Sequence, residues 1–153
     1  MTKSKVFKLA GVIVSLMGVI VACIATLVTP FFEYDDNLRY VAGKLGVDMN
    51  GMLLDQQGGV IIVGSVIGMA VMGLLAVLMG KAIAAIVIGM LEVGFAMYCS
   101  SIFAATLAEY SKWVSNGVGI TLVMLSGILV FAGGIIGLIG NIMKKREANQ
   151  QTV

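Results

Sequence analysis

The sequence contains no histidine, which is the commonest general base at neutral pH and a frequent metal ligand. The acidic and basic residues form no paired carboxylates, no nucleophile with an adjacent base, no phosphate-binding loop and no metal-ligand spacing. The usual centres of acid–base, covalent and metal chemistry are therefore missing. We expect a protein that is not an enzyme and that needs no cofactor and no metal.

Charge is also scarce: only 12% of the 153 residues are charged, whereas soluble domains carry about a quarter. Hydrophobic residues make up 59% of the chain, and the mean hydropathy is +1.05. The net charge of +2 is small and the basic residues form short clusters, so we expect no nucleic-acid partner. This composition indicates an integral membrane protein, whose partners are the lipid bilayer and other membrane helices.

Four apolar segments reach the length of about 20 residues that crosses a hydrocarbon core. The second and third are separated only by Lys81, and their joint length is too great for one crossing, so we expect a tight turn at Gly80 and Lys81. The runs show no alternation of period two, which favours helices. The sequence predicts one all-α integral membrane domain over residues 1–153, a four-transmembrane-helix bundle with spans at 9–29, 59–80, 82–108 and 117–143, outer loops at 30–58 and 109–116 and a tail at 144–153.

The basic residues predict the orientation of the bundle. Seven of the ten fall on the side of the two termini, and by the positive-inside rule both termini are cytoplasmic, in the cell membrane. Aromatic residues gather on the opposite side, and we expect them to anchor the outer interface. The seven basic residues are Lys3, Lys5, Lys8, Lys81, Lys144, Lys145 and Arg146, and the aromatic residues are Phe31, Phe32, Tyr34, Tyr110 and Trp113.

The N-terminal segment has a second interpretation. Lysines, an apolar stretch and the residues Ile20 to Cys23 resemble a bacterial lipoprotein signal, in which Cys23 is lipidated. The apolar run continues past Cys23 to Phe32, where a lipoprotein would turn polar. An uncleaved first helix is therefore the favoured interpretation, and lipidation of Cys23 stays open as the alternative.

The first outer loop is long enough to hold a short amphipathic helix. We expect Asp36 to cap it and Gly46 to end it, with Leu38, Val41 and Leu45 on one apolar face. That face should lie flat on the outer leaflet. The loop is then either a solvated connector or a contact surface for a partner.

Small residues recur at spacings of four and three in the first, third and fourth spans, which keeps them on one face of a left-handed bundle. We expect helix backbones to approach closely at these packing seams. The second span offers the pairs Gly64 with Gly68 and Ala76 with Gly80. The seams comprise Gly11, Ser15, Gly18, Ala22 and Ala25 in the first span, Ala85, Gly89, Glu92, Ala96 and Cys99 in the third, and Ser126, Val130, Gly133, Gly137 and Gly140 in the fourth.

Glu92 is a carboxylate in the middle of the third span. It lies roughly 15 Å from the cytoplasmic end of its helix, near the bilayer centre, and the other spans offer no Lys, Arg or His at that depth. An ionised carboxylate is costly there, which favours a neutral acid that donates a hydrogen bond to a carbonyl or to Ser15. Glu92 is then either an interhelical hydrogen-bonding residue or a site for a proton or cation in a wet cavity.

Three membrane families share single features with the chain. Glu92, Val93 and Gly94 resemble the glutamate segment of small multidrug resistance transporters, but that family carries its glutamate on the first helix. The proteolipid subunits of rotary ATPases commonly carry theirs on the last helix, and claudin-like proteins have a Trp and paired Cys in the outer loop. The order of residues here fits none of these patterns, so the chain is assigned to none of the three.

The sequence thus predicts a small non-enzymatic membrane protein. It would act by packing its helices against a second copy or another membrane protein, as a structural, assembly or accessory subunit. The alternative is a small proton-coupled transporter or channel subunit that uses Glu92.

Overall fold

The computed structural model describes residues 2–46, 49–55, 58–106 and 113–150. Four of its helices are long and apolar enough to cross a membrane, namely α1, α3, α4 and α5. The chain is therefore an all-helical, membrane-embedded bundle. In order, the elements are α1 (Lys3–Leu27), β1 (Phe32–Tyr34), α2 (Asp36–Lys44), the 3-10 helix η1 (Leu53–Asp55), α3 (Gly59–Leu78), α4 (Ala82–Thr106), β2 (Val114–Asn116) and α5 (Val118–Gln150).

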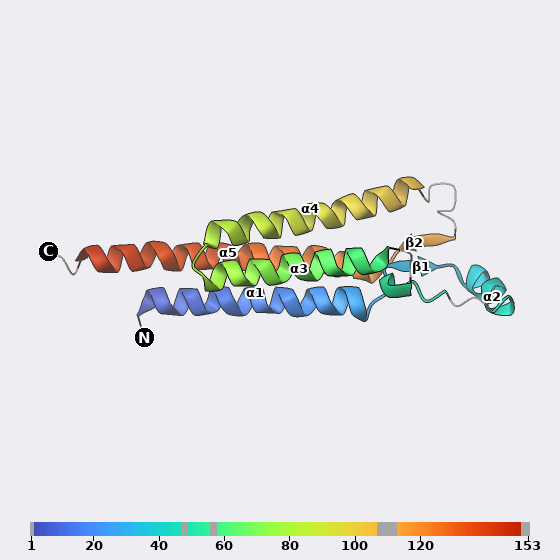
Figure 1. Ribbon diagram of the computed structural model, residues 1–153, viewed down its shortest axis with the longest axis horizontal. Coiled ribbons are helices and arrows are strands. Elements are labelled where there is room, and N and C mark those ends of the chain that lie inside the picture. Colours follow the sequence, from blue (N-terminus) through green and yellow to red (C-terminus); the bar gives the residue numbers. More distant parts are fainter. Residues whose placement is uncertain (1, 47–48, 56–57, 107–112, 151–153) are drawn as a thin grey trace.

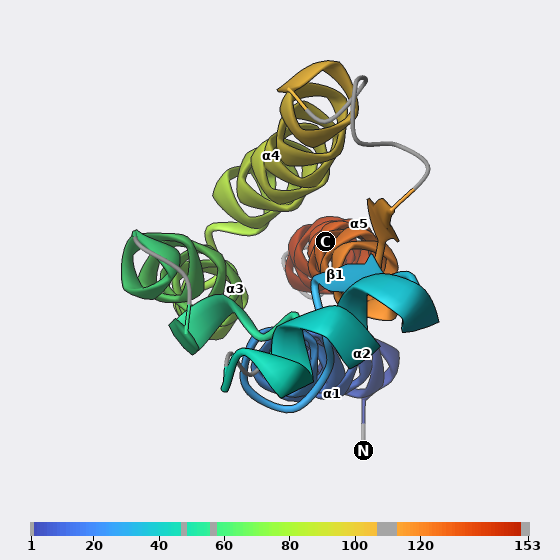
Figure 2. The same cartoon turned by 90° about the vertical axis from the view of Figure 1, so that its right-hand side faces the viewer.

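The central helix of the bundle is α5. It packs extensively against α1 and α4, which lie on opposite sides of it, and less extensively against α3 (Figure 2). Both termini lie at one end of the molecule, here called the terminal end (Figure 1). The strands and α2 lie at the other, here called the ribbon end, toward which α4 diverges from α3.

Glycines bring α5 close to both flanking helices. A Cβ on Gly11 of α1 would lie 2.8 Å from the carbonyl oxygen of Gly133 in α5, closer than real Cβ atoms approach. On the other side of α5, a Cβ on Gly89 of α4 would lie 2.8 Å from the carbonyl oxygen of Gly127. Lipid supplies no hydrophobic force between helices, so such close backbone contact is a main source of their attraction.

At the terminal end two helices extend beyond the predicted membrane spans. The first begins at Lys3 rather than at residue 9, and α5 continues to Gln150 through most of the predicted tail. Lys, Arg, Glu and Ala are good helix formers, and the hydroxyl of Ser4 donates a 2.7 Å hydrogen bond to Oε2 of Glu147, which joins the two extensions. The end predicted for the third span, residue 108, lies outside the described residues.

The turn expected between the second and third spans is present. Gly80 has a φ of +74°, which favours glycine, and the N–H of Lys81 donates to the carbonyl of Ala76 at 2.8 Å. The helix α4 then starts at once, at Ala82. The two helices therefore form a hairpin whose turn lies toward the terminal end (Figure 1).

A two-stranded antiparallel ribbon, for which the sequence gives no signal, joins the two loops of the ribbon end. β1 pairs with β2 so that Phe32 lies opposite Asn116 and Tyr34 opposite Val114. The pairing extends past the strands, because the N–H of Asp35 donates to the carbonyl of Trp113 at 2.8 Å. Strands of three residues carry too short a pattern for a sequence to reveal them.

The ribbon also corrects the prediction for the aromatic residues. Phe31 and Phe32 are only 2% and 7% exposed and belong to a buried cluster that includes Leu53 and Ile120. Their predicted role as anchors at the membrane interface is therefore wrong; they fill the core beneath the ribbon. Tyr110 lies outside the described residues.

The short helix α2 is present, and its capping residue differs from the predicted one. Its cap is Asp35, whose carboxylate accepts a 2.9 Å hydrogen bond from the N–H of Asn37, rather than Asp36. Figure 1 shows α2 beyond the strands, at the far tip of the ribbon end.

Candidate functional site

Glu92 is completely buried at the centre of the bundle. Its Oε1 lies 2.6 Å from Oγ of Ser126 in α5, and the same Oγ lies 2.9 Å from the carbonyl oxygen of Gly18 in α1. Ser126 is also fully buried. A single chain of polar contacts therefore links α4, α5 and α1 at one level.

The number of hydrogens decides how this chain is bonded. A serine hydroxyl carries one hydrogen, so Ser126 cannot donate fully to both oxygens at once. If Glu92 is a neutral acid, its O–H donates to Ser126, and Ser126 donates to the carbonyl of Gly18. Both short contacts are then hydrogen bonds, whereas an ionised Glu92 would compete with Gly18 for the one hydrogen. The geometry fits the neutral acid better.

The partner of Glu92 is Ser126 rather than Ser15 or a backbone carbonyl, the partners expected from the sequence. Ser15 is buried on α1, where its side chain packs against Gly133 of α5. Because α5 lies between α1 and α4, its own hydroxyl is the one that meets Glu92. Among the described residues, Oε2 of Glu92 and Oγ of Ser15 are buried without a hydrogen-bond partner.

The small residues of α1, α4 and α5 that were predicted as packing seams lie on buried faces. Substituting several of them would drive a Cβ into a backbone, as for Gly11, Gly89 and Gly133. The buried seam residues are Gly11, Ser15, Gly18, Ala22 and Ala25 in α1, Ala85, Gly89, Glu92, Ala96 and Cys99 in α4, and Ser126, Val130, Gly133, Gly137 and Gly140 in α5.

The small-residue pairs predicted in α3 do not pack against another helix of the same chain. Gly64 and Gly68 are exposed, and a Cβ added at either would meet nothing within 4 Å. Gly80 lies in the turn after the helix, and only Ala76 of the two predicted pairs is buried. The side of α3 that does pack inward carries valines, alanines and Gly73.

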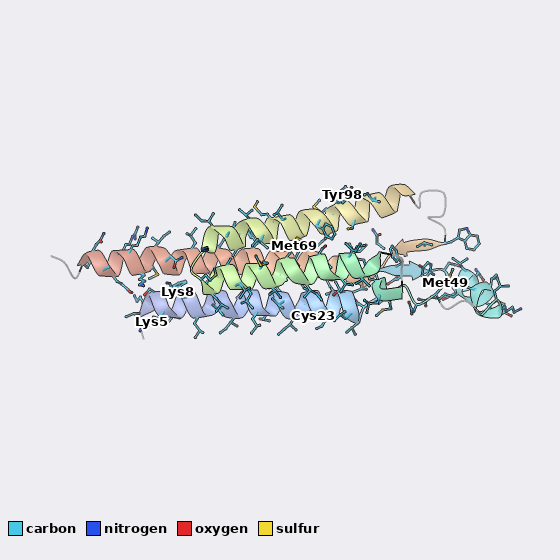
Figure 3. The ribbon with its side chains drawn as sticks, viewed as in Figure 1. Lys5, Lys8, Cys23, Met49, Met69 and Tyr98 are labelled. Carbon is cyan, nitrogen blue, oxygen red and sulfur yellow. The ribbon has the colours of Figure 1, made fainter. Side chains whose placement is uncertain are left out.

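Two of the three outer-loop residues singled out in the sequence line a pocket. Leu38 and Val41 of α2, with Tyr34 and Trp113 of the ribbon region, enclose an apolar space of about 490 Å³. Figure 3 shows Met49, which also lines it, beside α2. Leu45 follows α2 and is 75% exposed, so it does not share the pocket.

The described residues hold no group of three or more His, Cys, Asp or Glu side chains placed to bind a metal. Cys23 and Cys99 are free thiols, and α1 runs without interruption through Cys23. Comparison of the chain with protein-family models, with curated proteins and with solved structures finds no match.

Proposed function

We propose that the protein is a non-enzymatic membrane component that works by associating with a second copy of itself along α3. The observation that carries this proposal is the outward placement of Gly64 and Gly68. They are four residues apart on one face, with open space above both. In membranes this small-xxx-small spacing allows two helices to approach closely.

The rest of that face fits another helix rather than a soluble partner. Ile61, Met72 and Leu75 share it with the two glycines and are 74%, 58% and 45% exposed. These residues carry no charge, so a second identical face can pack against them without burying a charged group. A two-fold axis beside α3 would bring each face onto its copy and close the assembly as a dimer.

The orientation in the membrane is part of the same proposal. The basic residues near both termini and at Lys81 support a cytoplasmic terminal end in the cell membrane. The spacings of four and three on α1, α4 and α5 support left-handed packing within each copy. The ribbon and α2 would then face the outside.

Reconstitution tests the dimer directly. Donor- and acceptor-labelled fusions are mixed in liposomes, and energy transfer is followed as lipid dilutes the protein. The double variant Gly64→Leu with Gly68→Leu should dissociate at a protein density about tenfold higher than wild type. This shift corresponds to a loss of roughly 1.4 kcal/mol in the free energy of dimerisation. Its fold should be unaffected, because a Cβ added at either position has no other helix of the same chain within 4 Å.

The matched control is Gly94→Leu. Gly94 is also exposed in a long helix with nothing within 4 Å of an added Cβ, but Met90 and Tyr98 occupy the positions four residues away. This variant should dimerise like wild type. A wild-type protein that stays monomeric at every density, or a Gly94→Leu effect equal to that of the double variant, would reject the α3 dimer.

A second function, binding of a proton or cation at Glu92, is favoured by one observation. Oε2 of Glu92 and Oγ of Ser15 are buried and unpartnered among the described residues, which leaves two oxygens for a ligand or a water. Buried polar groups of this kind are often functional in membrane proteins.

Flux through liposomes separates the two functions. The measured quantity is the flux of protons, sodium and potassium across the liposome membrane. If Glu92 is structural, liposomes with wild type or with Glu92→Gln should leak no faster than liposomes without protein. A wild-type flux that is lost in Glu92→Gln, with the variant still folded by gel filtration, would replace the structural role with a transport role.

A further inference from the structure

A basic pocket lies at the terminal end, away from Glu92. It has a volume of about 620 Å³, and four lysines line it: Lys8 of α1, Lys81 of the turn between α3 and α4, and Lys144 and Lys145 of α5. Three separate segments of the chain therefore direct positive charge to one place. The side chain of Asn141, which donates to the carbonyl of Gly80 at 2.9 Å, fixes the turn against α5 beside them.

The positive charge of this cluster exceeds the negative charge that the described residues place beside it. None of the four lysines forms an ion pair with a described residue. Glu147 lies in a neighbouring pocket beside Lys8 and Lys144, and its Oε2 accepts the hydrogen bond from Ser4. Four like charges around one cavity repel each other, and a bound anion would relieve that repulsion.

The position of the pocket indicates the kind of anion. It lies where α3 ends and α4 begins, which is the depth of lipid headgroups for helices that span a membrane. Its other wall is apolar, formed by Ile83 of α4 with Leu138 and Ile142 of α5. A charged rim next to an apolar wall suits a molecule with an anionic head and a hydrocarbon tail.

We propose that this pocket binds the phosphate of an anionic phospholipid, with an acyl chain along the apolar wall. Lysine is a common phosphate ligand, and basic clusters at the ends of membrane helices attract anionic lipids. The aliphatic stem of Lys8 lies against Gly140 of α5, beside the pocket that Lys8 lines. Figure 3 shows Lys8 near the terminal end of α1. The N–H of Ala85 donates to the carbonyl of Lys81 at the start of α4. The N–H groups that precede it in the first turn have no partner within the helix, so they are further donors for a phosphate beside the pocket.

Native mass spectrometry of the full chain in an uncharged detergent measures this binding. The probes are phosphatidylglycerol, phosphatidylcholine and inorganic phosphate. Phosphatidylglycerol should bind at least about tenfold more tightly than the other two. The triple variant Lys81→Gln, Lys144→Gln, Lys145→Gln should weaken it by about tenfold or more, and the single variant Lys81→Gln by about threefold to fivefold.

The control variant removes the same charge elsewhere: Lys3→Gln, Arg39→Gln, Arg146→Gln. These residues are exposed and do not line the pocket. It should bind phosphatidylglycerol within about twofold of wild type. Three results would overturn the lipid site. Equal losses of affinity in both triple variants would mean diffuse attraction to the charged surface. Phosphatidylcholine that binds as tightly as phosphatidylglycerol would mean an apolar contact only, and inorganic phosphate that binds as tightly would mean a soluble ligand.

Discussion

Replacement of Gly89 by leucine should destabilise the bundle by about 3 kcal/mol or more. An added Cβ at this position would lie 2.5 Å from the backbone nitrogen of Phe131 and 2.8 Å from the carbonyl oxygen of Gly127. Backbone atoms inside a helix cannot move aside as a flexible side chain can, so α4 would have to separate from α5. The free energy of unfolding in lipid bicelles measures the loss.

The variant Gly94→Leu lies on the same helix and makes the same chemical change. It faces open space, so its free energy of unfolding should stay within about 0.5 kcal/mol of wild type. This comparison cancels the change in helix propensity, because both variants replace glycine by leucine within α4. Similar losses at both positions would mean that α4 does not pack on α5 through Gly89.

A second large effect is expected at the centre of the bundle. Glu92→Lys should cost about 3 kcal/mol, because it places an ammonium group where Ser126 and Gly18 offer only a hydroxyl and a carbonyl. No other acidic residue lies within the described membrane-spanning helices near this level to pair with it. The same bicelle measurement reports the loss.

Glu92→Gln is the matched substitution at this position. Its amide can donate to Ser126 as a neutral acid does, and it has nearly the same shape, so stability should stay within about 0.5 kcal/mol of wild type. A Lys variant as stable as the Gln variant would show that water or a counter-charge reaches the site. The bundle would then not be dry at Glu92.

The four long helices could be predicted from the sequence because their signal is local. Twenty apolar residues in a row indicate a span without any knowledge of its neighbours. The spacing of Gly11, Gly18 and similar residues is local too, and the structure buries those residues. The same holds for Glu92, whose position in the spacing pattern of α4 places it inward.

What the sequence could not reveal depends on which helix lies at the centre. From the sequence alone, Ser15 and Ser126 are equally good hydrogen-bonding partners for Glu92. Only the position of α5 between α1 and α4 selects Ser126. The small residues of α3 show the same ambiguity, because their spacing does not say whether Gly64 and Gly68 face this chain or another. The ribbon pairs two loops far apart in the sequence, which leaves no local pattern.

The pocket of lysines shows a related limit. Lys8, Lys81 and Lys144 each look like an ordinary signal of membrane orientation when read singly. Only the packing of α1, the hairpin turn and α5 at the terminal end brings them around one cavity.

The dimer along α3 is tested most directly by disulfide formation in native membranes. In a background of Cys23→Ala and Cys99→Ala, a single cysteine is introduced as Gly64→Cys, Gly68→Cys or Gly94→Cys, and the membranes are oxidised. A two-fold contact through the glycine face brings identical positions together, so Gly64→Cys or Gly68→Cys should yield a crosslinked dimer and Gly94→Cys should remain monomeric. Crosslinking of Gly94→Cys alone, or of none of the three, would contradict association through α3.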